Sequence, residues 1–552
     1  MRAQLRTCLT AATLALACST LGACSDDTSD ELSHPDLPET LGGPARGISI
    51  VSVEANQGVG VTLLEGESYI GPDERNAYLV RNRDTLVRFQ HVIDDPDRWI
   101  PRELTGILHI VPPGEDADEL LRVRTIYVEE DSDPRKLGEN FFFSLLADEA
   151  VPGTRFWLEL RESDSAIDVS SLAEGVPSVP SEPREIGFEP TDLDLEVVIV
   201  PVDYQWVDPP RYPDITDDDL KIFYDELLQQ NPVQDIKISI RDEPLVWDEQ
   251  LSNLGSLLSP TRALKEADEA PPNVYYHALV DVGGSSVNMV AGIAWLTDDS
   301  MDQAPRRTAA TVYYKRVVEG DPETDEPDTV YPPISSARTW VHEIGHNQGL
   351  SHVYCPGADS ANPDPDYPHE NGKIGGFGFG IRSYHMHTPT ASHDYMTYCG
   401  NSWVSDWTWN KTYERIQTLT SWNSAALVPP ERVPTLVGTL FADGSEDWWL
   451  FEGPAPSPEA LSSTERLEFW VEGERHVALA EVSTLSDGET RVLTVPMPAA
   501  LEPEVETRGL GGVVDGLSRL DSEGERHPVE LAAVHEQAFV AARQRAKVRA
   551  AH

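Results

Sequence analysis

Apolar residues are spaced differently in successive stretches of the chain. From residue 47 to 175, short runs rich in β-branched and aromatic residues alternate with turn-forming clusters, as in ISIVSVEA, LVRFQHVI and RFWLELRE. Short runs at such intervals predict the strands of a β-sandwich. The next stretch, 176–190, begins VPSVPSEPRE, and its prolines predict a linker without regular structure.

Residues 191–428 interleave two kinds of pattern. The runs LEVVIVPV, VYYHALVDV and MVAGIAWL predict strands, whereas DITDDDLKIFYDELLQQN has an acidic first turn and apolar residues at helical spacing. SSARTWVHEIGHNQGL predicts a second helix, capped by Ser335 or Ser336 and ended at Gly349. Strands alternating with helices predict an α/β domain.

After Pro429 and Pro430 the chain again has strand-like runs, including TLVGTLFA, DWWLFEG and RLEFWVEG. We expect a small β-rich domain over residues 429–552, with a terminal helix from Val529. No internal repeat is found. The fold class predicted for the whole chain is therefore multidomain α+β, with β domains on both sides of a central α/β domain.

The first 23 residues have the layout of a bacterial signal peptide. Two arginines precede a short apolar stretch that ends in Leu-Gly-Ala-Cys, which resembles a lipobox. We expect Cys24 to be lipidated and residues 24–46 to form a flexible acidic tether. The protein would then be exported and anchored at the cell envelope or surface through Cys24. An ordinary signal peptide, with Cys24 an incidental thiol, is the alternative.

The chain is strongly acidic, and this limits its partners. Its net charge is −52, and removal of Arg2 and Arg6 with the signal would make it −54. Such a surface repels nucleic acid and anionic lipid, so the expected membrane contact is the lipid on Cys24 alone. The pattern gives no information on oligomeric state. Beyond Cys24 only Cys355 and Cys399 remain, either as a disulfide or as two buried thiols.

The residues that point to chemistry lie in WVHEIGHNQGLSH. Because residues four apart share one face of a helix, His342 and His346 can bind one metal ion, with Glu343 beside them to take a proton from metal-activated water. Gly349 allows the chain to turn so that His352 returns as a third ligand. Three imidazoles leave zinc an open coordination position, which is typical of a catalytic site and predicts one catalytic Zn²⁺.

The pattern HExxHxxGxxH resembles that of the metzincin clan of zinc endopeptidases. The resemblance covers residues 195–425 and implies a metzincin-like α/β catalytic domain. It also implies a methionine turn beneath the metal, for which HDYMTYCG offers Met396. Tyr398 matches a tyrosine that some members use as a ligand or as a donor to the tetrahedral intermediate; a simply packed ring is the alternative. The chain most resembles bacterial secreted lipoprotein proteases of the clan. Val353 stands where several animal families have an acidic residue, which argues against those families.

One strand and one loop near the motif have weaker sequence patterns. By analogy with the clan, the strand of Gly292, Ile293, Ala294 and Trp295 would pair with an extended substrate, although an ordinary buried strand fits equally well. The loop after His352 is rich in Gly, Pro and acidic residues. It could bind Ca²⁺ or simply be a solvated loop; the candidate ligands are Asp359, Asp364, Asp366 and Glu370.

The sequence therefore predicts a zinc-dependent endopeptidase that cuts extracellular proteins or glycoproteins, with water activated by Glu343. The alternative is a surface-anchored adhesin or glycan-binding lipoprotein that carries an inactive protease-like domain. The presence of all three histidines together with Glu343 favours the enzyme.

Overall fold

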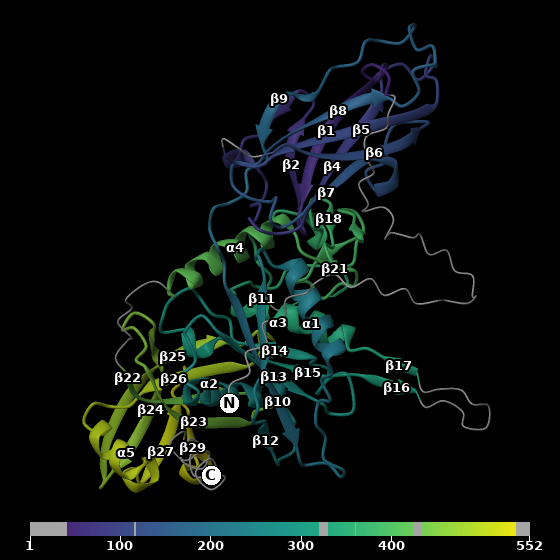
Figure 1. Cartoon of the computed structure of the whole chain (residues 1–552). Helices are drawn as coiled ribbons and strands as arrows, with labels where there is room; N and C mark the ends of the chain where they lie inside the picture. The colour runs from purple at the N-terminus through teal and green to yellow at the C-terminus, as the bar shows by residue number, and fades with distance from the viewer. Residues whose placement is uncertain are drawn as a thin grey trace, which may run out of the picture.

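The computed structural model describes residues 41–114, 118–318, 329–358, 360, 362–423 and 432–536. Within them the protein is mostly β-sheet with few helices and is built in several parts. Figure 1 shows the N-terminal sheets at the top, helix α4 (Asp406–Ser421) beneath them, the central sheet in the middle and the C-terminal sheet at the lower left. The expected signal peptide and Cys24 lie outside the described residues. No helix in the described part is long and apolar enough to cross a bilayer.

Two antiparallel sheets form the N-terminal part. The first has the order β3-β2-β1-β4-β7 and the second β6-β5-β8-β9. Their strands are β1 (Ile48–Asn56), β2 (Gly60–Glu65), β3 (Ser68–Tyr69), β4 (Thr85–Ile93), β5 (Arg102–Val111), β6 (Leu120–Val128), β7 (Phe141–Leu145), β8 (Arg155–Glu162) and β9 (Val179–Glu185). The sheets share a core in which the rings of Phe89 and Phe156 lie 6.3 Å apart. Alternating inward-facing residues therefore build the sandwich that the sequence predicts.

Parts of two segments expected to lack structure are ordered: residues 41–46 of the tether, whose residues 24–40 lie outside the described part, and residues 179–185 of the linker. The end of the tether packs on β8, since the Gly42 N–H donates to Glu162 O at 2.8 Å and Ala45 is buried. The expected linker forms β9, which pairs with β8 at the edge of its sheet. An edge strand tolerates prolines because one side of it makes no ladder hydrogen bonds.

The central part is an α/β unit around a mostly parallel sheet. The order is β11-β10-β13-β15-β14, with β12 also beside β10, and only the edge strand β14 runs antiparallel to its neighbour. The strands are β10 (Leu195–Tyr204), β11 (Ile236–Ile240), β12 (Leu245–Trp247), β13 (Tyr275–Val280), β14 (Gly292–Ala294) and β15 (Thr308–Val312). Every residue of β13 is buried, as expected for a central strand of a parallel sheet.

Helices α1 (Asp217–Gln230), α2 (Leu258–Ala267) and α3 (Ile334–Asn347) accompany this sheet. Thr216 and Asp219 cap α1 reciprocally, which explains its acidic start. Helix α3 contacts α1, β14 and β15, so the predicted metal motif lies beside the sheet edge. Three short ribbons complete this part: β16 (Arg316–Val318) with β17 (Thr329–Tyr331), β18 (Gly378–Phe379) with β19 (Met386–His387), and β20 (His393–Asp394) with β21 (Ser402–Trp403).

The C-terminal part is one sheet in the order β28-β27-β24-β25-β26-β22-β23-β29. Its elements are β22 (Arg432–Leu440), β23 (Glu446–Pro454), β24 (Leu461–Val471), β25 (Glu474–Thr484), β26 (Arg491–Pro496), α5 (Glu502–Arg508), β27 (Gly516–Leu520), β28 (Arg526–Val529) and β29 (Val534–Glu536). The helix expected from Val529 is wrong at its start, because 534–536 pair with β23. Its remainder, 537–550, lies outside the described residues.

Single turns of 3₁₀ helix connect several of these elements: η1 (Pro72–Glu74), η2 (Leu137–Glu139), η3 (Leu254–Leu257), η4 (Ala304–Arg306), η5 (Glu370–Gly372), η6 (Leu510–Gly512) and η7 (Leu531–Ala533).

The parts share hydrophobic cores. One core continues from the N-terminal sandwich into α1, α3 and α4, where the rings of Tyr78 and Tyr413 stack at 4.2 Å. Another joins the central sheet to the C-terminal sheet and contains Trp295, Trp449 and Leu485. Continuous apolar packing of this kind favours a fixed arrangement of parts over independently moving modules.

Arg83 connects the N-terminal part to the C-terminal end of α1 through hydrogen bonds. Arg83 is 2% exposed, and its guanidinium donates to the carbonyl oxygens of Gln57, Leu228 and Val233. Burial lowers its pKa to about 9, so Arg83 keeps its charge at neutral pH. Because each carbonyl would otherwise be buried without a donor, this one side chain stabilises the junction.

Replacing Arg83 should therefore weaken the junction. Arg83→Met keeps the apolar stem but removes every donor, and we expect the free energy of unfolding to fall by about 2–4 kcal/mol. Urea denaturation followed by tryptophan fluorescence measures this loss. Arg81→Met is the matched control, since Arg81 is 29% exposed on its side chain and should change stability by less than about 0.5 kcal/mol. Equal effects of the two changes would contradict the assignment.

Candidate metal centre

The predicted histidines lie at the C-terminal end of α3, where a backbone motif turns the chain. The N–H of Gly349 donates to His346 O at 2.9 Å and the N–H of Leu350 to Gly345 O at 3.0 Å. These two bonds form a Schellman motif, which requires a left-handed residue, and Gly349 has φ +86°. The expected role of Gly349 thus matches its geometry.

The cap expected from Ser335 or Ser336 is wrong. Helix α3 begins after Pro333 without a side-chain cap, and both serines lie in its first turn. The Ser336 hydroxyl instead accepts from Tyr314 N–H at 2.9 Å and donates to Val312 O at 2.8 Å. It joins the helix to the end of β15 and so fixes the position of α3 against the sheet.

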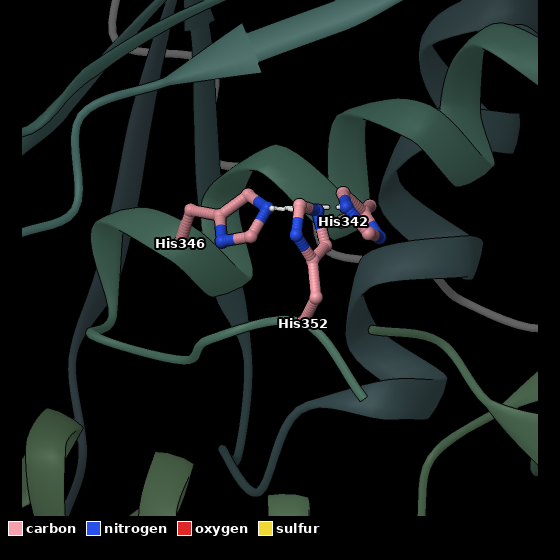
Figure 2. A group of neighbouring side chains, drawn as sticks. All are labelled: His342, His346 and His352. Carbon is pink, nitrogen blue, oxygen red and sulfur yellow. Dashed lines mark hydrogen bonds between the residues drawn. The ribbon is translucent and has the colours of Figure 1, made fainter. Parts of the chain in front are cut away.

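Three ring nitrogens converge below α3. His346 Nε2 lies 3.1 Å from His342 Nε2 and 3.2 Å from His352 Nε2, as Figure 2 shows. A tetrahedral zinc ion with Zn–N bonds of 2.0–2.1 Å would hold ligand nitrogens about 3.3 Å apart. The spacing of the three imidazoles therefore fits one small divalent ion.

The protonation of two of these rings also fits a bound cation. His342 Nδ1 lies 2.7 Å from Tyr395 O and His346 Nδ1 lies 2.7 Å from Leu350 O, so in both rings Nδ1 carries the proton. Burial lowers the pKa of His342 to about 4 and that of His346 well below its usual value. Both rings are then neutral, and their Nε2 atoms have lone pairs and no hydrogen. Facing lone pairs repel unless a cation lies between them, so the donor set fits a metal.

A turn after β20 supports the site from beneath. The Asp394 carboxylate accepts from the N–H of Met396 at 2.8 Å and from the Thr408 hydroxyl at 2.6 Å. This holds the turn that presents Tyr395 O to His342. Met396 is fully buried, and a Cβ built at Gly345 would lie 2.6 Å from its sulfur. Met396 therefore packs directly against helix α3 at Gly345.

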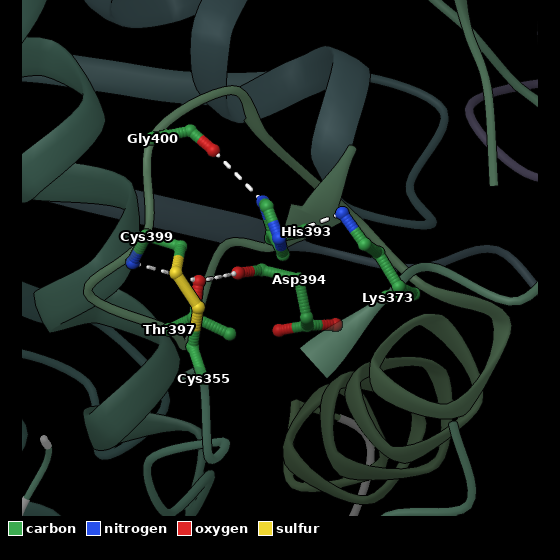
Figure 3. The surroundings of a disulfide bond; sticks show 7 residues. All are labelled: Cys355, Lys373, His393, Asp394, Thr397, Cys399 and Gly400. Atoms are coloured by element: carbon green, nitrogen blue, oxygen red, sulfur yellow. Dashed lines mark hydrogen bonds between the residues drawn. A yellow bond between two sulfur atoms is a disulfide. The ribbon is translucent and has the colours of Figure 1, made fainter. Parts of the chain in front are cut away.

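The predicted disulfide is present. Cys355, three residues beyond His352, is bonded to Cys399, three beyond Met396, with Cα atoms 6.2 Å apart (Figure 3). Beside it, His393 Nδ1 lies 3.0 Å from Gly400 O, and Lys373 Nζ donates to His393 Nε2 at 2.7 Å. The bridge links the segment that carries the third histidine to the turn that carries Met396.

Glu343 is buried on the sheet side of α3. A Cβ built at Gly292 would lie 2.6 Å from Glu343 Oε1, so the edge strand runs directly against this carboxylate. On its other side, the Ser486 hydroxyl lies 3.3 Å from Glu343 Oε2. Burial raises the pKa of Glu343 to about 8, and the hydrogen bond from Ser486 partly offsets this rise. The carboxylate can therefore change protonation near neutral pH.

Tyr398 lies at the open side of the histidines. Its ring centroid is 5.8 Å from that of His342 and 4.7 Å from that of His352, and half of the residue is exposed. Partial burial raises the pKa of its phenol, and the negative charges of Glu343 and Asp487 raise it further. The phenol is protonated at neutral pH and can donate a hydrogen bond.

The tentative substrate strand is an edge strand, but part of it is already paired. The backbone N–H and C=O groups of Gly292 and Ala294 point away from β15. This follows from the antiparallel pattern, because the N–H of the next residue, Trp295, bonds to Thr308 O of β15. The Ala294 N–H donates to Ser486 Oγ at 2.9 Å, and Ala294 O accepts from Ser486 N–H at 3.0 Å. Trp295 is 2% exposed. The outer backbone edge of Ala294 is thus already bonded to Ser486, and the substrate-binding role expected for the strand from Gly292 to Trp295 stays a prediction.

The strand is also shorter than its apolar run. The run MVAGIAWL predicts a strand over 289–296, yet β14 spans only Gly292–Ala294. Asn288 and Met289 have φ values of 48° and 70°, which an extended strand excludes.

The calcium interpretation gains no support from the described residues. Asp364 forms an ion pair with Lys411 at 2.7 Å, and Asp359 lies outside the described residues. The groups of potential ligands that converge within the described part are His342 with His346 and His352, Cys355 with His393 and Cys399, and Asp521 with Glu525 and His527. The acidic loop after His352, with Asp366 and Glu370, is not among them, and calcium binding there stays a prediction.

Two functional neighbours are absent from the sequence-based prediction. Asp394 could have been found, since an acidic residue two positions before a turn methionine is placed to accept its N–H. Ser486 could not, because it lies 143 residues from Glu343 and nothing in its local sequence marks it.

Comparison with known proteins gives no assignment. No family model matches the chain, and no curated protein is similar to it. Among solved structures, a cycloisomaltooligosaccharide glucanotransferase of Paenibacillus sp. in complex with cycloisomaltoheptaose aligns with 84% of this chain and 71% of its own. The identity is 10% and the TM-score 0.15. A similarity that low carries no argument about fold or function.

Metal binding by the histidines can be measured directly. We expect the purified chain to bind one zinc ion and His346→Ala to lose it, because two imidazoles cannot hold zinc against a competing chelator. Atomic absorption after dialysis against a chelator gives the stoichiometry. His385→Ala, an exposed histidine of the same part, should leave zinc binding unchanged. Full zinc retention by the His346 variant would contradict the site.

Proposed function

We propose that the protein is a zinc-dependent endopeptidase of the metzincin type. The observation that carries the proposal is the convergence of three buried imidazoles with the carboxylate of Glu343 one residue after the first of them. Such a set, with three protein ligands and a nearby base of raised pKa, is typical of a hydrolytic metal site.

Other features support the metzincin resemblance. The motif helix lies beside a mostly parallel sheet whose one antiparallel strand, β14, is at the edge. The chain turns at Gly349 to return His352, and Met396 is buried against Gly345 of the same helix. A metzincin-like α/β domain accounts for all of these positions with one arrangement.

The chemistry follows from the positions of the side chains. When bound, zinc supplies Lewis acidity, which polarises a peptide carbonyl and acidifies water. Glu343 accepts the proton of the attacking water, and its raised pKa then suits it to deliver that proton to the leaving amine. The hydrogen bonds to Tyr395 O and Leu350 O hold two imidazoles in the tautomer that ligation requires.

Tyr398 is proposed to stabilise the developing oxyanion. It is protonated, lies beside two of the histidines and is half exposed, so a substrate carbonyl can reach its hydroxyl.

The setting of the reaction is also a proposal. Cys24 would be the lipidated N-terminus of an exported protein, and a disulfide beside the metal site suits an oxidising compartment. The substrates would be extracellular proteins or glycoproteins, since the strong negative charge is unsuited to nucleic acid.

Substitution of Glu343 tests its role as the general base. Glu343→Gln should retain one zinc ion but reduce kcat for a protein substrate by about 10²–10⁴-fold, because the amide cannot accept a proton. The assay is cleavage of a denatured protein with and without a chelator, followed by mass spectrometry. Glu370→Gln, an exposed glutamate in the loop after His352, should have full activity. Zinc-loaded chain that cleaves no substrate would favour the adhesin or glycan-binding alternative.

Substitution of Tyr398 tests the role of its phenol. Tyr398→Phe should lower kcat by about 10²–10³-fold while KM changes little, since the hydrogen bond is made to the transition state. Steady-state kinetics on a fluorogenic peptide separates the two constants. Tyr354→Phe, a comparably exposed tyrosine near the motif, serves as the control. An unchanged kcat would leave Tyr398 as a packing residue.

A further inference from the structure

A turn of the C-terminal sheet reaches the candidate metal centre. Strands β25 and β26 pair up to Thr484 and Arg491, and the turn between them closes with a bond from Leu485 N–H to Thr490 O at 2.9 Å. Leu485 forms a bridge with Trp295, at the end of β14. A residue in this turn can therefore contact both the edge strand and helix α3.

Ser486 makes three bonds across this contact. Its N–H donates to Ala294 O at 3.0 Å, and its hydroxyl oxygen accepts the Ala294 N–H at 2.9 Å. The same oxygen lies 3.3 Å from Glu343 Oε2. Because the oxygen already accepts from Ala294, its single hydrogen is directed to the carboxylate. Ser486 is 6% exposed, so water competes little for these bonds.

The Glu343 carboxylate has little freedom between its neighbours. Gly292 closes one side, where even a Cβ would collide with Oε1, and Ser486 holds Oε2 on the other. Within the described part of the chain, Ser486 provides the side-chain hydrogen bond to this carboxylate. Loss of that bond would let the side chain change rotamer within its buried space.

The turn itself is rigid. The Asp487 carboxylate accepts from the N–H of Thr490 at 2.9 Å and from its hydroxyl at 2.5 Å. Leu485 is 1% exposed in the core shared with Trp295, and Arg306 pairs with Glu481 of β25 at 2.7 Å. The Ser486 hydroxyl is therefore held in place before any substrate arrives.

We propose that Ser486 is a positioning residue that orients the general base Glu343 from the C-terminal sheet. The inference rests on the proposed peptidase function. It makes the C-terminal sheet part of the catalytic machinery, because one of its turns fixes the carboxylate that moves the proton. In this arrangement Ser486 occupies the outer edge of β14 at Ala294, so an extended substrate would pair with the strand at Gly292.

The same contact could instead block the site, and the two roles predict opposite results. If the turn only occupied the edge strand in place of substrate, weakening it would raise kcat/KM. If Ser486 orients Glu343, removing the hydroxyl lowers kcat and leaves KM nearly unchanged.

The test uses Ser486→Ala in the full mature chain loaded with zinc. We expect kcat on a fluorogenic peptide to fall roughly 10–100-fold, the usual effect of losing a supporting hydrogen bond at a metal site, with zinc content unchanged. Ser486→Thr keeps the hydroxyl and should recover most of the rate. Ser445→Ala is the matched control, since Ser445 bonds Asp443 in the turn between β22 and β23, away from Glu343.

A second variant keeps the test decisive if the alanine change lowers stability. Thr490→Val leaves Ser486 in place but removes the hydroxyl that holds Asp487, and it should give a smaller loss of kcat. Unchanged or increased kcat in Ser486→Ala would overturn the proposal while the peptidase function stands. A wild-type chain that binds zinc yet cleaves nothing, as inactive as Glu343→Gln, would instead overturn the proposed function and this inference with it.

Discussion

The candidate site depends on three imidazole nitrogens that converge on one point. Two of the rings give their Nδ1 hydrogens to backbone carbonyls, and burial keeps both rings uncharged. The carbonyl of Leu350 is in place because Gly349 turns the chain there, and the carbonyl of Tyr395 because Asp394 holds the following turn. Backbone geometry therefore orients two of the three rings, and neither His342 nor His346 could rotate away without losing its bond to a backbone carbonyl.

The surrounding architecture keeps these elements in register. Helix α3 is joined to β15 through Ser336, packed on α1, and tied through the disulfide after His352 to the segment that carries Met396. The N-terminal sandwich adds a buried arginine clamp at the far end of α1, and the C-terminal sheet shares a core with the central one. Each part thus limits the movement of the next, which suits a site that must hold its geometry before a ligand binds.

Local spacing explains what could be predicted from the sequence. The histidine motif, the turn at Gly349, the pairing of Cys355 with Cys399 and most of the strands follow from short-range patterns and few cysteines. The failures came from tertiary context. Within the proline-rich stretch, residues 179–185 form strand β9 because they pair at a sheet edge, and the helical pattern beginning at Val529 yields to pairing of β29 with β23. The contact of Ser486 with Glu343 could not be predicted, because only the fold brings the two residues together.

The core shared by the central and C-terminal sheets has a consequence for dissecting this molecule. Trp295 and Leu257 pack with Trp449 and Phe451 across that junction, and Arg262 lies over the Phe451 ring. A fragment that stops after α4 would present this apolar surface to solvent. Aggregation of such a fragment would then result from this exposed apolar surface, and would not be an intrinsic property of the part that carries the histidines.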